Sequence, residues 1–246
     1  MGKSLDEIRI MLIQIRERVD VARQEQTCFV EHCGVRHDQI DAINVAHEPT
    51  PCAERVSEAD VVMIGGAGAF SVTHDHSFHE PLANMVRRIC QEGTPLFGVC
   101  WGHQFLAKIL GGTVVHDDSL GEVGTNPVRL TPAGASDPLF DGLPEEFLAH
   151  MGHHDYVQAL PDGATELAVS TVCPNQAFRL NGAPIYGTQF HVELSAVRLM
   201  ERLRIYQHIY VPDKEELDLL EQAPKDTPET DGVLRRFLEM YVVDGN

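Results

Sequence analysis

The chain has 246 residues, 43% of them hydrophobic, which suffices to bury the core of one large domain or two small ones. Its 19 basic and 37 acidic residues give a formal net charge of −18, and such a field repels phosphate backbones and anionic lipid surfaces, which argues against nucleic acid and membranes as partners. The first residues are charged throughout and no apolar run approaches about 18 residues, so we expect neither a signal peptide nor a membrane span, and a cytoplasmic protein.

Apolar runs alternate with helical patterns in the first part of the chain. Short apolar runs rich in β-branched residues predict buried parallel strands, and longer amphipathic runs predict helices. Pro81 in a first helical turn, and Gly34 and Gly93 just beyond helix ends, mark helix boundaries. The predicted strands are 8–15, 40–45, 61–64 and 96–99, and the predicted helices are 19–33, 81–91 and 102–110. This alternation indicates a three-layer α/β fold with a doubly wound, mostly parallel sheet.

The pattern changes after about residue 112. Short strand-like segments separated by Pro, Gly and Asp turns predict an added small antiparallel β element. These segments are 128–130, 167–170, 176–180 and 185–190, and they are followed by helical patterns at 194–210, 214–222 and 233–242. We expect one domain over residues 1–210, with an acidic helical extension over 211–246 that packs on it or trails from it.

The segment PLFGVCWGHQFLAKILGG places a cysteine between a strand and a helix. Cys100 follows the strand at once and a helix begins within two residues, so we expect its side chain to project from a tight turn above the sheet. Gly98 and Gly102 give the G-x-C-x-G form of a nucleophile elbow, whose neighbours must be small. The helix N-terminus favours a thiolate, and the backbone N–H of Trp101 faces the place where an oxyanion would form. The alternative interpretation is a buried structural cysteine beside packing glycines.

A histidine and a glutamate stand at alternate positions at the end of the strand-like segment IYGTQFHVE. In an extended chain His191 and Glu193 share a face, about 7 Å apart along the strand. A thiolate nucleophile needs a proton carrier oriented by a third group, and this pair supplies both. A lone histidine near a strand end is more often a polar surface residue, but the preceding β run strengthens the catalytic interpretation.

A glycine-rich turn, Gly65-Gly66-Ala67-Gly68, follows the third predicted strand. Successive glycines let backbone N–H groups approach a ligand closely, so a glycine N–H here would complement that of Trp101 at an oxyanion. A dinucleotide-binding loop is the competing interpretation. It is weak, because GGAGAF lacks the G-x-G-x-x-G spacing and follows the third strand, not the first.

Taken together, GVCWGHQ, QFHVE and the GGAG turn resemble the class I glutamine amidotransferases, which use a Cys-His-Glu triad. LGGTVVH, EVGTNPVRLT, DPLFDGLPEEF, GHHDYVQALPDGA and CPNQAFRLNG are also similar to that family, so the resemblance spans about residues 8–200. It points to stand-alone proteins similar to the glutaminase domain of GMP synthetase, since we see no synthetase domain in this sequence. The resemblance implies a flavodoxin-like fold with neither a cofactor nor a metal.

The resemblance also implies a role for each matched residue. Cys100 would attack the side-chain amide of glutamine to form a γ-glutamyl thioester, and His191, oriented by Glu193, would protonate the leaving ammonia and then activate water. The N–H groups of Gly66 and Trp101 would form the oxyanion hole. The residues expected to hold the substrate are Gly65, Gln104, Gly152, His153 and Asp155.

Three positions depart from the family pattern. Val192 stands where H-P-E is usual, and loss of that proline is expected to loosen His191 without removing the triad. Ala67 stands where GGP is usual, which is expected to leave the loop more mobile until substrate or a partner arrives. Trp101 replaces a more common Tyr or Leu, but only its backbone is needed.

Other reactive side chains are interpreted as structural. His74, His76 and His79 have the chemistry of metal ligands, but no second cluster has matching spacing, so we expect a loop at the rim of the substrate site. Cys28 and His32 are i, i+4 neighbours on a predicted helix and are expected to pack in the core. All six cysteines are expected to be free thiols: Cys28, Cys33, Cys52, Cys90, Cys100 and Cys173.

The expected function is therefore cysteine-dependent hydrolysis of a γ-glutamyl amide. In one version the protein is a glutaminase that feeds ammonia to a separate synthetase subunit. In another it is a self-sufficient hydrolase of γ-glutamyl peptides or conjugates. A third possibility is a regulatory binding protein that keeps the triad residues without their alignment.

Overall fold

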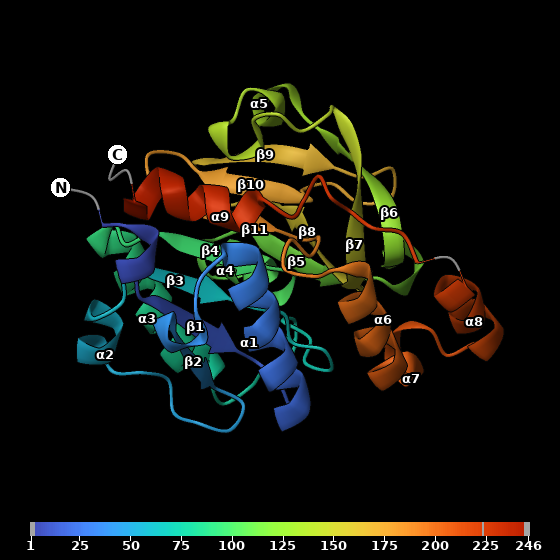
Figure 1. The fold of residues 1–246 in the computed structure, drawn as a ribbon, viewed down its shortest axis with the longest axis horizontal. Helices are drawn as coiled ribbons and strands as arrows, with labels where there is room; N and C mark the ends of the chain where they lie inside the picture. The colour runs from blue at the N-terminus through green and yellow to red at the C-terminus, as the bar shows by residue number, and fades with distance from the viewer. Residues whose placement is uncertain (1–2, 223, 244–246) are drawn as a thin grey trace.

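A nine-stranded sheet runs through the centre of the molecule, with strand order β2-β1-β3-β4-β11-β10-β9-β6-β7 (Figure 1). The computed structural model describes residues 3–222 and 224–243. The remaining positions, 1–2, 223 and 244–246, belong to the segments expected at 1–210 and 211–246 and lie outside this description. No helix within the described ranges combines the length and the apolar character needed to span a bilayer.

Five neighbouring strands of this sheet are parallel. They are β1 (Ile10–Gln14), β2 (Ile40–Asn44), β3 (Val61–Ile64), β4 (Leu96–Val99) and β11 (Ile185–Thr188). Gly98 of β4 pairs with Ile64 of β3 on one side and with Gly187 of β11 on the other. The segments that follow these three strands therefore leave the same edge of the sheet, and they carry the glycine turn, Cys100 and His191.

Antiparallel strands continue the same sheet beyond β11. They are β10 (Ala177–Leu180), β9 (Ala164–Val169), β6 (Glu122–Leu130) and β7 (Glu146–His153), and a separate two-stranded sheet pairs β5 (Thr113–His116) with β8 (Asp155–Ala159). The α/β fold with a mostly parallel centre and an added antiparallel element is thus confirmed. The antiparallel part is larger than predicted, because the segment 128–130 is only the end of a nine-residue strand and β5, β7 and β8 were not predicted. The segment 185–190 was expected in the antiparallel element, but β11 pairs in parallel with β4 and is antiparallel only to β10.

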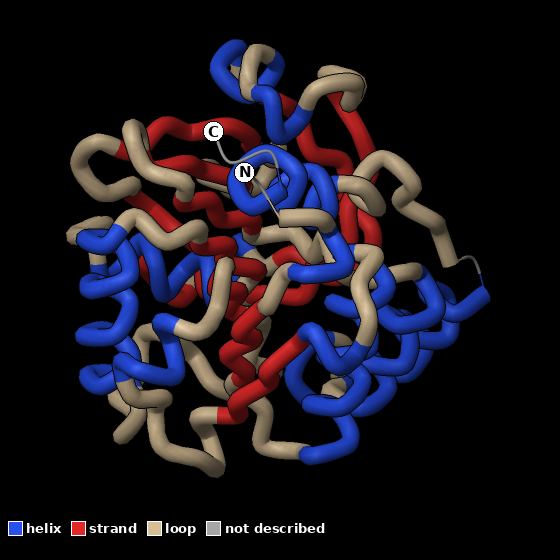
Figure 2. The backbone as a smooth tube through the Cα atoms, turned by 60° about the vertical axis from the view of Figure 1, so that its left-hand side comes forward, coloured by secondary structure: helices blue, strands red, loops and turns tan. Residues whose placement is uncertain are grey.

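Helices cover both faces of the parallel strands (Figures 1 and 2). On one face, α1 (Val19–Cys33) and α9 (Val233–Leu238) share a core cluster with Ile10 and Leu12 of β1. On the other, α3 (His79–Glu92) and α4 (Trp101–Ile109) share one with Met11 and Ile13. Successive side chains of β1 alternate between the two faces, as a fully buried strand requires.

The shorter helices and turns complete the architecture. They are α2 (Ala53–Ser57), α5 (Pro132–Ala135), α6 (Ala196–Ile205), α7 (Gln207–Tyr210), α8 (Lys214–Gln222), a π-helical segment at Glu239–Val243, and 3-10 turns at Leu5–Glu7, His37–Gln39, Asp118–Leu120 and Pro138–Phe140. The helices α1 and α3 end at Gly34 and Gly93 in left-handed conformations, with φ of 66° and 72°, as predicted.

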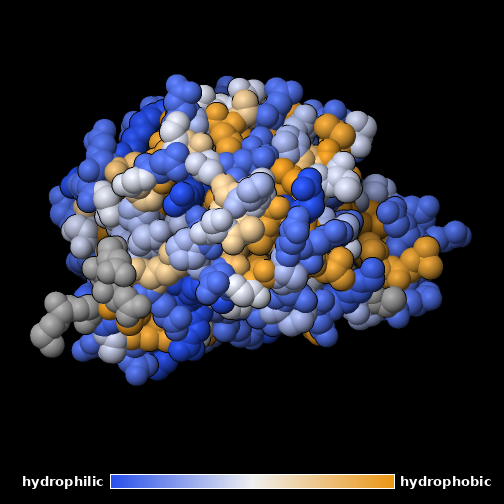
Figure 3. Space-filling view, turned by 90° about the horizontal axis from the view of Figure 1, so that it is seen from above, coloured by the Kyte–Doolittle hydropathy of each residue, from blue (hydrophilic) through white to orange (hydrophobic). Residues whose placement is uncertain are grey.

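The last two helices differ in burial. All four apolar residues of α9 that face the sheet are fully buried, and the ring of Phe237 lies 5.1 Å from that of Phe97 in β4, centroid to centroid. In contrast, α8 buries Leu217 and leaves Leu219 67% exposed. Figure 3 shows a largely hydrophilic surface with small hydrophobic patches, one of them at the projecting end that α8 forms.

Candidate active site

Cys100 lies between β4 and α4 in an unusual backbone conformation, with φ of 52° and ψ of −104°. A positive φ is uncommon outside glycine and costs on the order of 1–3 kcal/mol to hold. The neighbouring backbones touch here: a Cβ on Gly98 would lie 2.6 Å from the carbonyl carbon of Gly102, and one on Gly102 would overlap the Ile64 oxygen. The structure thus has the tight turn that the G-x-C-x-G spacing predicts.

His191 and Glu193 come together just beyond the end of β11. The Nδ1 atom of His191 lies 2.8 Å from Oε1 of Glu193, and Glu193 is fully buried. Arg202, which the sequence reasoning missed, donates from Nη1 to the same oxygen at 3.0 Å. Arg202 belongs to α6, and nothing in its local sequence signals a partner on another element.

Charges around His191 favour its protonated form. Burial lowers the pKa of His191, but the Glu193 carboxylate and the Cys100 thiol beside it outweigh that effect and raise the pKa to about 9. Burial raises the pKa of Glu193, yet His191 and Arg202 together hold it well below its ordinary value. At neutral pH the pair is therefore an imidazolium and a carboxylate, the state that a general acid needs.

A chain of amides connects the Cys100 sulfur to the strand β8. The Sγ atom lies 3.9 Å from the Gly152 oxygen and accepts a hydrogen bond from Nε2 of Gln189 at 3.7 Å. Gln104 donates to Oε1 of Gln189 at 3.0 Å and to the backbone oxygen of Asp155 at 2.7 Å. Gln189 was not predicted, although the alternation that pairs His191 with Glu193 extends to it.

The glycine turn after β3 is hydrogen-bonded to a buried carboxylate. The Gly66 N–H donates to Oε1 of Glu25 at 3.2 Å, a charge-assisted hydrogen bond. Gly65 donates to the Ile13 oxygen and accepts from Gly102, so its backbone is engaged within the fold, and it is not among the residues that line the two cavities described below. The Gly66 N–H expected at an oxyanion thus points to Glu25 here, and the expected role requires that bond to break.

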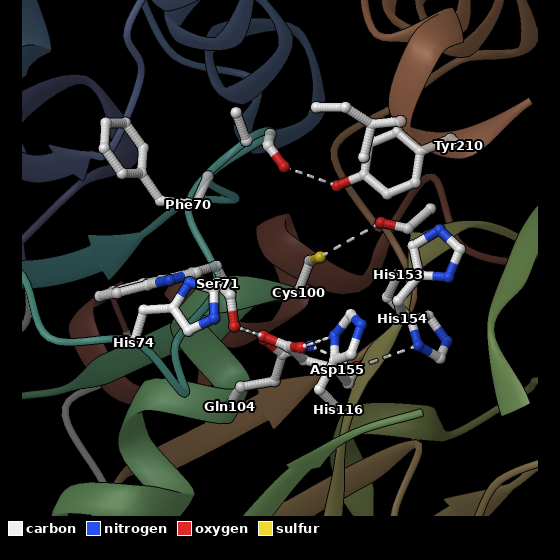
Figure 4. Close-up of a pocket in the computed structure, with 16 residues that line it drawn as sticks. Phe70, Ser71, His74, Cys100, Gln104, His116, His153, His154, Asp155 and Tyr210 are labelled. Atoms are coloured by element: carbon white, nitrogen blue, oxygen red, sulfur yellow. Dashed lines mark hydrogen bonds and ion pairs between the residues drawn. The ribbon is translucent and has the colours of Figure 1, made fainter. Parts of the chain in front are cut away.

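Asp155, expected to hold the substrate, already has partners on both oxygens (Figure 4). Its Oδ2 accepts from Ser71 Oγ at 2.6 Å and from the Val72 N–H at 3.0 Å. Its Oδ1 lies 2.7 Å from Nδ1 of His116, and this hydrogen bond raises the pKa of His116. Asp155 therefore ties β8 to β5 and to the loop after the glycine turn, and a substrate ammonium would add to these contacts.

Two cavities meet at Cys100. The larger, of about 210 Å³, opens between the loop carrying Phe70 and Ser71 and the histidines at 153 and 154 (Figure 4). Its lining contains Cys100 and five of the other predicted site residues: Trp101, Gln104, Gly152, His153 and Asp155. The smaller, of about 30 Å³, lies on the side of His191 and is lined by Gly66 as well.

The histidines after the glycine turn form an aromatic cluster. The ring of His76 stacks on Phe78 with centroids 5.2 Å apart, and burial lowers the pKa of His79 to about 4. His74 reaches the larger cavity. Within the described ranges, 3–222 and 224–243, no three or more His, Cys, Asp or Glu side chains are placed to hold a metal ion.

Three thiols away from the site remain protonated at neutral pH. Burial raises the pKa of Cys28 to about 12, of Cys90 to about 11 and of Cys173 to about 12. Since the thiolate is the reactive form, these cysteines are poor nucleophiles. Cys28 packs in a small core cluster with residues of α6, as expected for its helix.

Known proteins share this sequence pattern and fold. The family model of class I glutamine amidotransferases matches residues 29–202. A glutamine-hydrolyzing GMP synthase subunit of Archaeoglobus fulgidus is 33% identical over 147 residues, which are 60% of this chain and 73% of that protein. The glutamine-hydrolyzing GMP synthase of Streptomyces avermitilis is 35% identical over 146 residues, 58% of this chain but only 26% of that longer protein.

Solved structures show the same fold at lower identity. The crystal structure of a glutamine amidotransferase from Thermotoga maritima superposes with a TM-score of 0.75 at 23% identity, covering 96% of this chain and 98% of that one. A putative GMP synthase subunit from Thermoplasma acidophilum gives a TM-score of 0.68 at 21% identity, covering 95% and 93%.

Proposed function

The chain belongs to the class I glutamine amidotransferases, and from that premise we propose that it is a cysteine-dependent hydrolase of the glutamine side-chain amide. One observation carries the proposal. A cysteine held at positive φ stands beside a buried, charged His191–Glu193 pair, and a cavity opens in front of it. These are the parts that covalent catalysis by a thiolate needs: nucleophile, proton carrier and orienting carboxylate.

In the first proposed step, the Cys100 thiolate attacks the side-chain carbonyl carbon of glutamine. The new carbon–sulfur bond gives a tetrahedral oxyanion, which the backbone N–H of Trp101 at the start of α4 would stabilise. The carbon–nitrogen bond then breaks, and the nitrogen takes the His191 proton and leaves as ammonia. The product is a γ-glutamyl thioester with a neutral imidazole.

In the second step, water replaces the leaving nitrogen. His191 removes a proton from water as the oxygen attacks the thioester carbon, and the carbon–sulfur bond breaks to release glutamate and restore the thiolate. Glu193 and Arg202 remain charged throughout and hold the imidazole in one orientation.

Substrate binding is proposed for the larger cavity. Gln104, Gly152, His153 and Asp155 line it beside the sulfur, and the Asp155 carboxylate is placed to attract the α-ammonium of glutamine. The Gly66 N–H would join Trp101 in the oxyanion hole once it leaves Glu25.

The use of the ammonia is proposed from the relatives. The name of the Archaeoglobus protein describes one subunit of a GMP synthase, so we propose that ammonia passes to a separate synthetase subunit. We also propose that residues 1–210 form the catalytic domain and that the extension 211–246 belongs to the same unit, since the core packing of α9 supports this.

A diazo-ketone analogue of glutamine tests the proposal directly. We expect one stoichiometric adduct on the intact mass of the wild-type protein and none on Cys100→Ala. His191→Asn should lower turnover on the order of 10²-fold or more, the usual scale for losing a general acid–base group. A Cys100 that resists the analogue would support a non-catalytic binding protein, and an unchanged rate in His191→Asn would refute the proton carrier.

A further inference from the structure

The smaller cavity beside Cys100 has no role in the steps above. Its volume of about 30 Å³ has room for roughly two water-sized groups. It shares Cys100 and Gly152 with the lining of the larger cavity, and three leucines, Leu194, Leu199 and Leu203, supply apolar lining.

Unused hydrogen-bond donors gather around this cavity. Arg202 is 6% exposed and uses Nε for Gln24 and Nη1 for Glu193, while its Nη2 is buried with no partner. The hydroxyl of Tyr206 is also buried and has no hydrogen-bond partner that meets the usual distance and angle limits. It lies close to the Arg16 guanidinium. Unsatisfied buried donors are costly and rare in folded proteins, so they point to a ligand that accepts hydrogen bonds.

Two arginines line this cavity, and each is paired with a buried carboxylate. Arg16 and Arg202 line it, while their partners Glu25 and Glu193 are not among its lining residues. In the part of the chain that the structure describes, no Asp or Glu side chain contributes to the lining. The lining therefore offers guanidinium, imidazole and hydroxyl donors without a competing carboxylate, which suits a carboxylate better than an ammonium.

The position of His191 shows which part of a substrate this cavity would meet. A general acid must lie within hydrogen-bond reach of the leaving nitrogen, and His191 lines the smaller cavity. A substituent on that nitrogen therefore extends toward the smaller cavity while the γ-glutamyl group occupies the larger one. In an α-amino acid, the carboxylate carbon is two bonds from the nitrogen, roughly 2.5 Å away.

We propose that the smaller cavity is a subsite for the α-carboxylate of a leaving amino acid, so that γ-glutamyl amino acids are preferred over glutamine. This inference rests on the proposed thioester chemistry at Cys100. The bonds made and broken are those already given, with an amino acid leaving in place of ammonia after taking the His191 proton. Arg202 Nη2 and the Tyr206 hydroxyl are the donors to the carboxylate.

Four substrates of graded structure test the proposal on the full chain. They are γ-glutamylglycine, γ-glutamylglycinamide, γ-glutamylmethylamide and glutamine, and the measured quantity is kcat/KM for each. The glycinamide keeps the size but not the charge, and the methylamide removes the carbonyl group as well. We expect γ-glutamylglycine to exceed each of the others by on the order of tenfold to a hundredfold, the usual value of a charged hydrogen bond in a buried site.

Tyr206→Phe provides a second readout, because it removes one donor and leaves the Arg202–Glu193 contact in place. It should reduce the preference for γ-glutamylglycine over γ-glutamylmethylamide by several-fold. Tyr241→Phe is the matched control, since its hydroxyl contacts Tyr186 and lies outside both cavities, and it should leave that preference unchanged.

The possible results separate this inference from the proposed function. Equal rates for γ-glutamylglycine and γ-glutamylmethylamide would overturn the subsite, and equal rates for γ-glutamylglycine and its amide would overturn the carboxylate. Either result with an intact diazo-ketone adduct on Cys100 leaves the thioester chemistry standing. Absence of the adduct would instead remove the proposed function, and the subsite with it. If Tyr206→Phe does not fold, the comparison of substrates on the wild type still decides.

Discussion

Replacing Glu193 by glutamine removes one charge from the buried pair and keeps the shape of the side chain. In the wild type the carboxylate, 2.8 Å from Nδ1, is the largest favourable influence on the His191 pKa and opposes the effect of burial. Without it, burial is opposed mainly by the Cys100 thiol. We therefore expect the His191 pKa in Glu193→Gln to return to its ordinary value or below.

The expected loss of activity follows from the change in the His191 pKa. Moving the pKa from about 9 to 6.5 changes the free energy of protonating His191 by roughly 3 kcal/mol. At pH 8 the imidazolium fraction falls from roughly 90% to roughly 3%, about thirtyfold. Since the general acid must be protonated, kcat/KM at pH 8 should fall by at least that factor, and more if the ring also loses its orientation.

The assay is the pH dependence of kcat/KM for ammonia release. In the wild type, activity should decline as pH rises through about 9, and in Glu193→Gln this alkaline limb should lie below about pH 7. The free energy of unfolding should also fall as the pH rises through the pKa of His191. Because the folded pKa of His191 is raised, its contribution is complete below about pH 6.5 and is lost as pH rises through about 9.

Asp137→Asn is the control for loss of a buried carboxylate. Asp137 is also buried and paired, with Arg179 and Tyr186, but it lies outside both cavities. The Asp137→Asn substitution should lower the stability of the protein and leave the alkaline limb of the kcat/KM profile unchanged. If Glu193→Gln folds and its alkaline limb coincides with that of the wild type, the assignment of Glu193 as the group that charges His191 is wrong.

Three further substitutions probe the support of the site. Gly102→Ala forces a methyl group onto the Ile64 oxygen, so thermal unfolding should show a loss of about 1–3 kcal/mol, and an unchanged transition would contradict the close packing. Glu25→Ala leaves Arg16 buried and unpaired, which should cost about 3–5 kcal/mol in urea unfolding, whereas a loss below about 1 kcal/mol would show that the pair is dispensable. Asp155→Asn should raise KM for glutamine about tenfold to a hundredfold with a smaller change in kcat, and an unaltered KM would remove Asp155 from substrate binding.

The parallel half of the fold could be predicted because its signals are local. The strands 61–64 and 96–99 have the predicted bounds, since fully buried strands are continuous apolar runs between turns. The long strand β6 contains Gly124, Asn126 and Pro127, residues with poor strand propensity, and it forms through pairing with β7. Pairing between distant strands cannot be recognised from a short stretch of sequence.

The candidate site likewise has a part that could be predicted from local sequence and a part that could not. The nucleophile turn and the alternation of His191 with Glu193 each depend on residues close together in the sequence, so both could be predicted. The charged groups that surround them could not, because Glu25 and Arg202 lie on helices where a charged residue usually faces solvent. Their burial depends on which side of each helix meets the sheet edge, and this is decided by packing between distant segments.

The placement of α9 bears on how the protein comes into being. A ribosome delivers the strands β1 and β4 long before residues 233–238, and domains acquire structure as their segments emerge. Until that helix arrives, Phe97 lacks the ring of Phe237 that packs against it, and part of this face of the sheet is uncovered. Such an uncovered apolar surface invites aggregation or chaperone capture. Nascent chains stalled just before position 233 should therefore be sensitive to proteases, and those released just after 238 resistant.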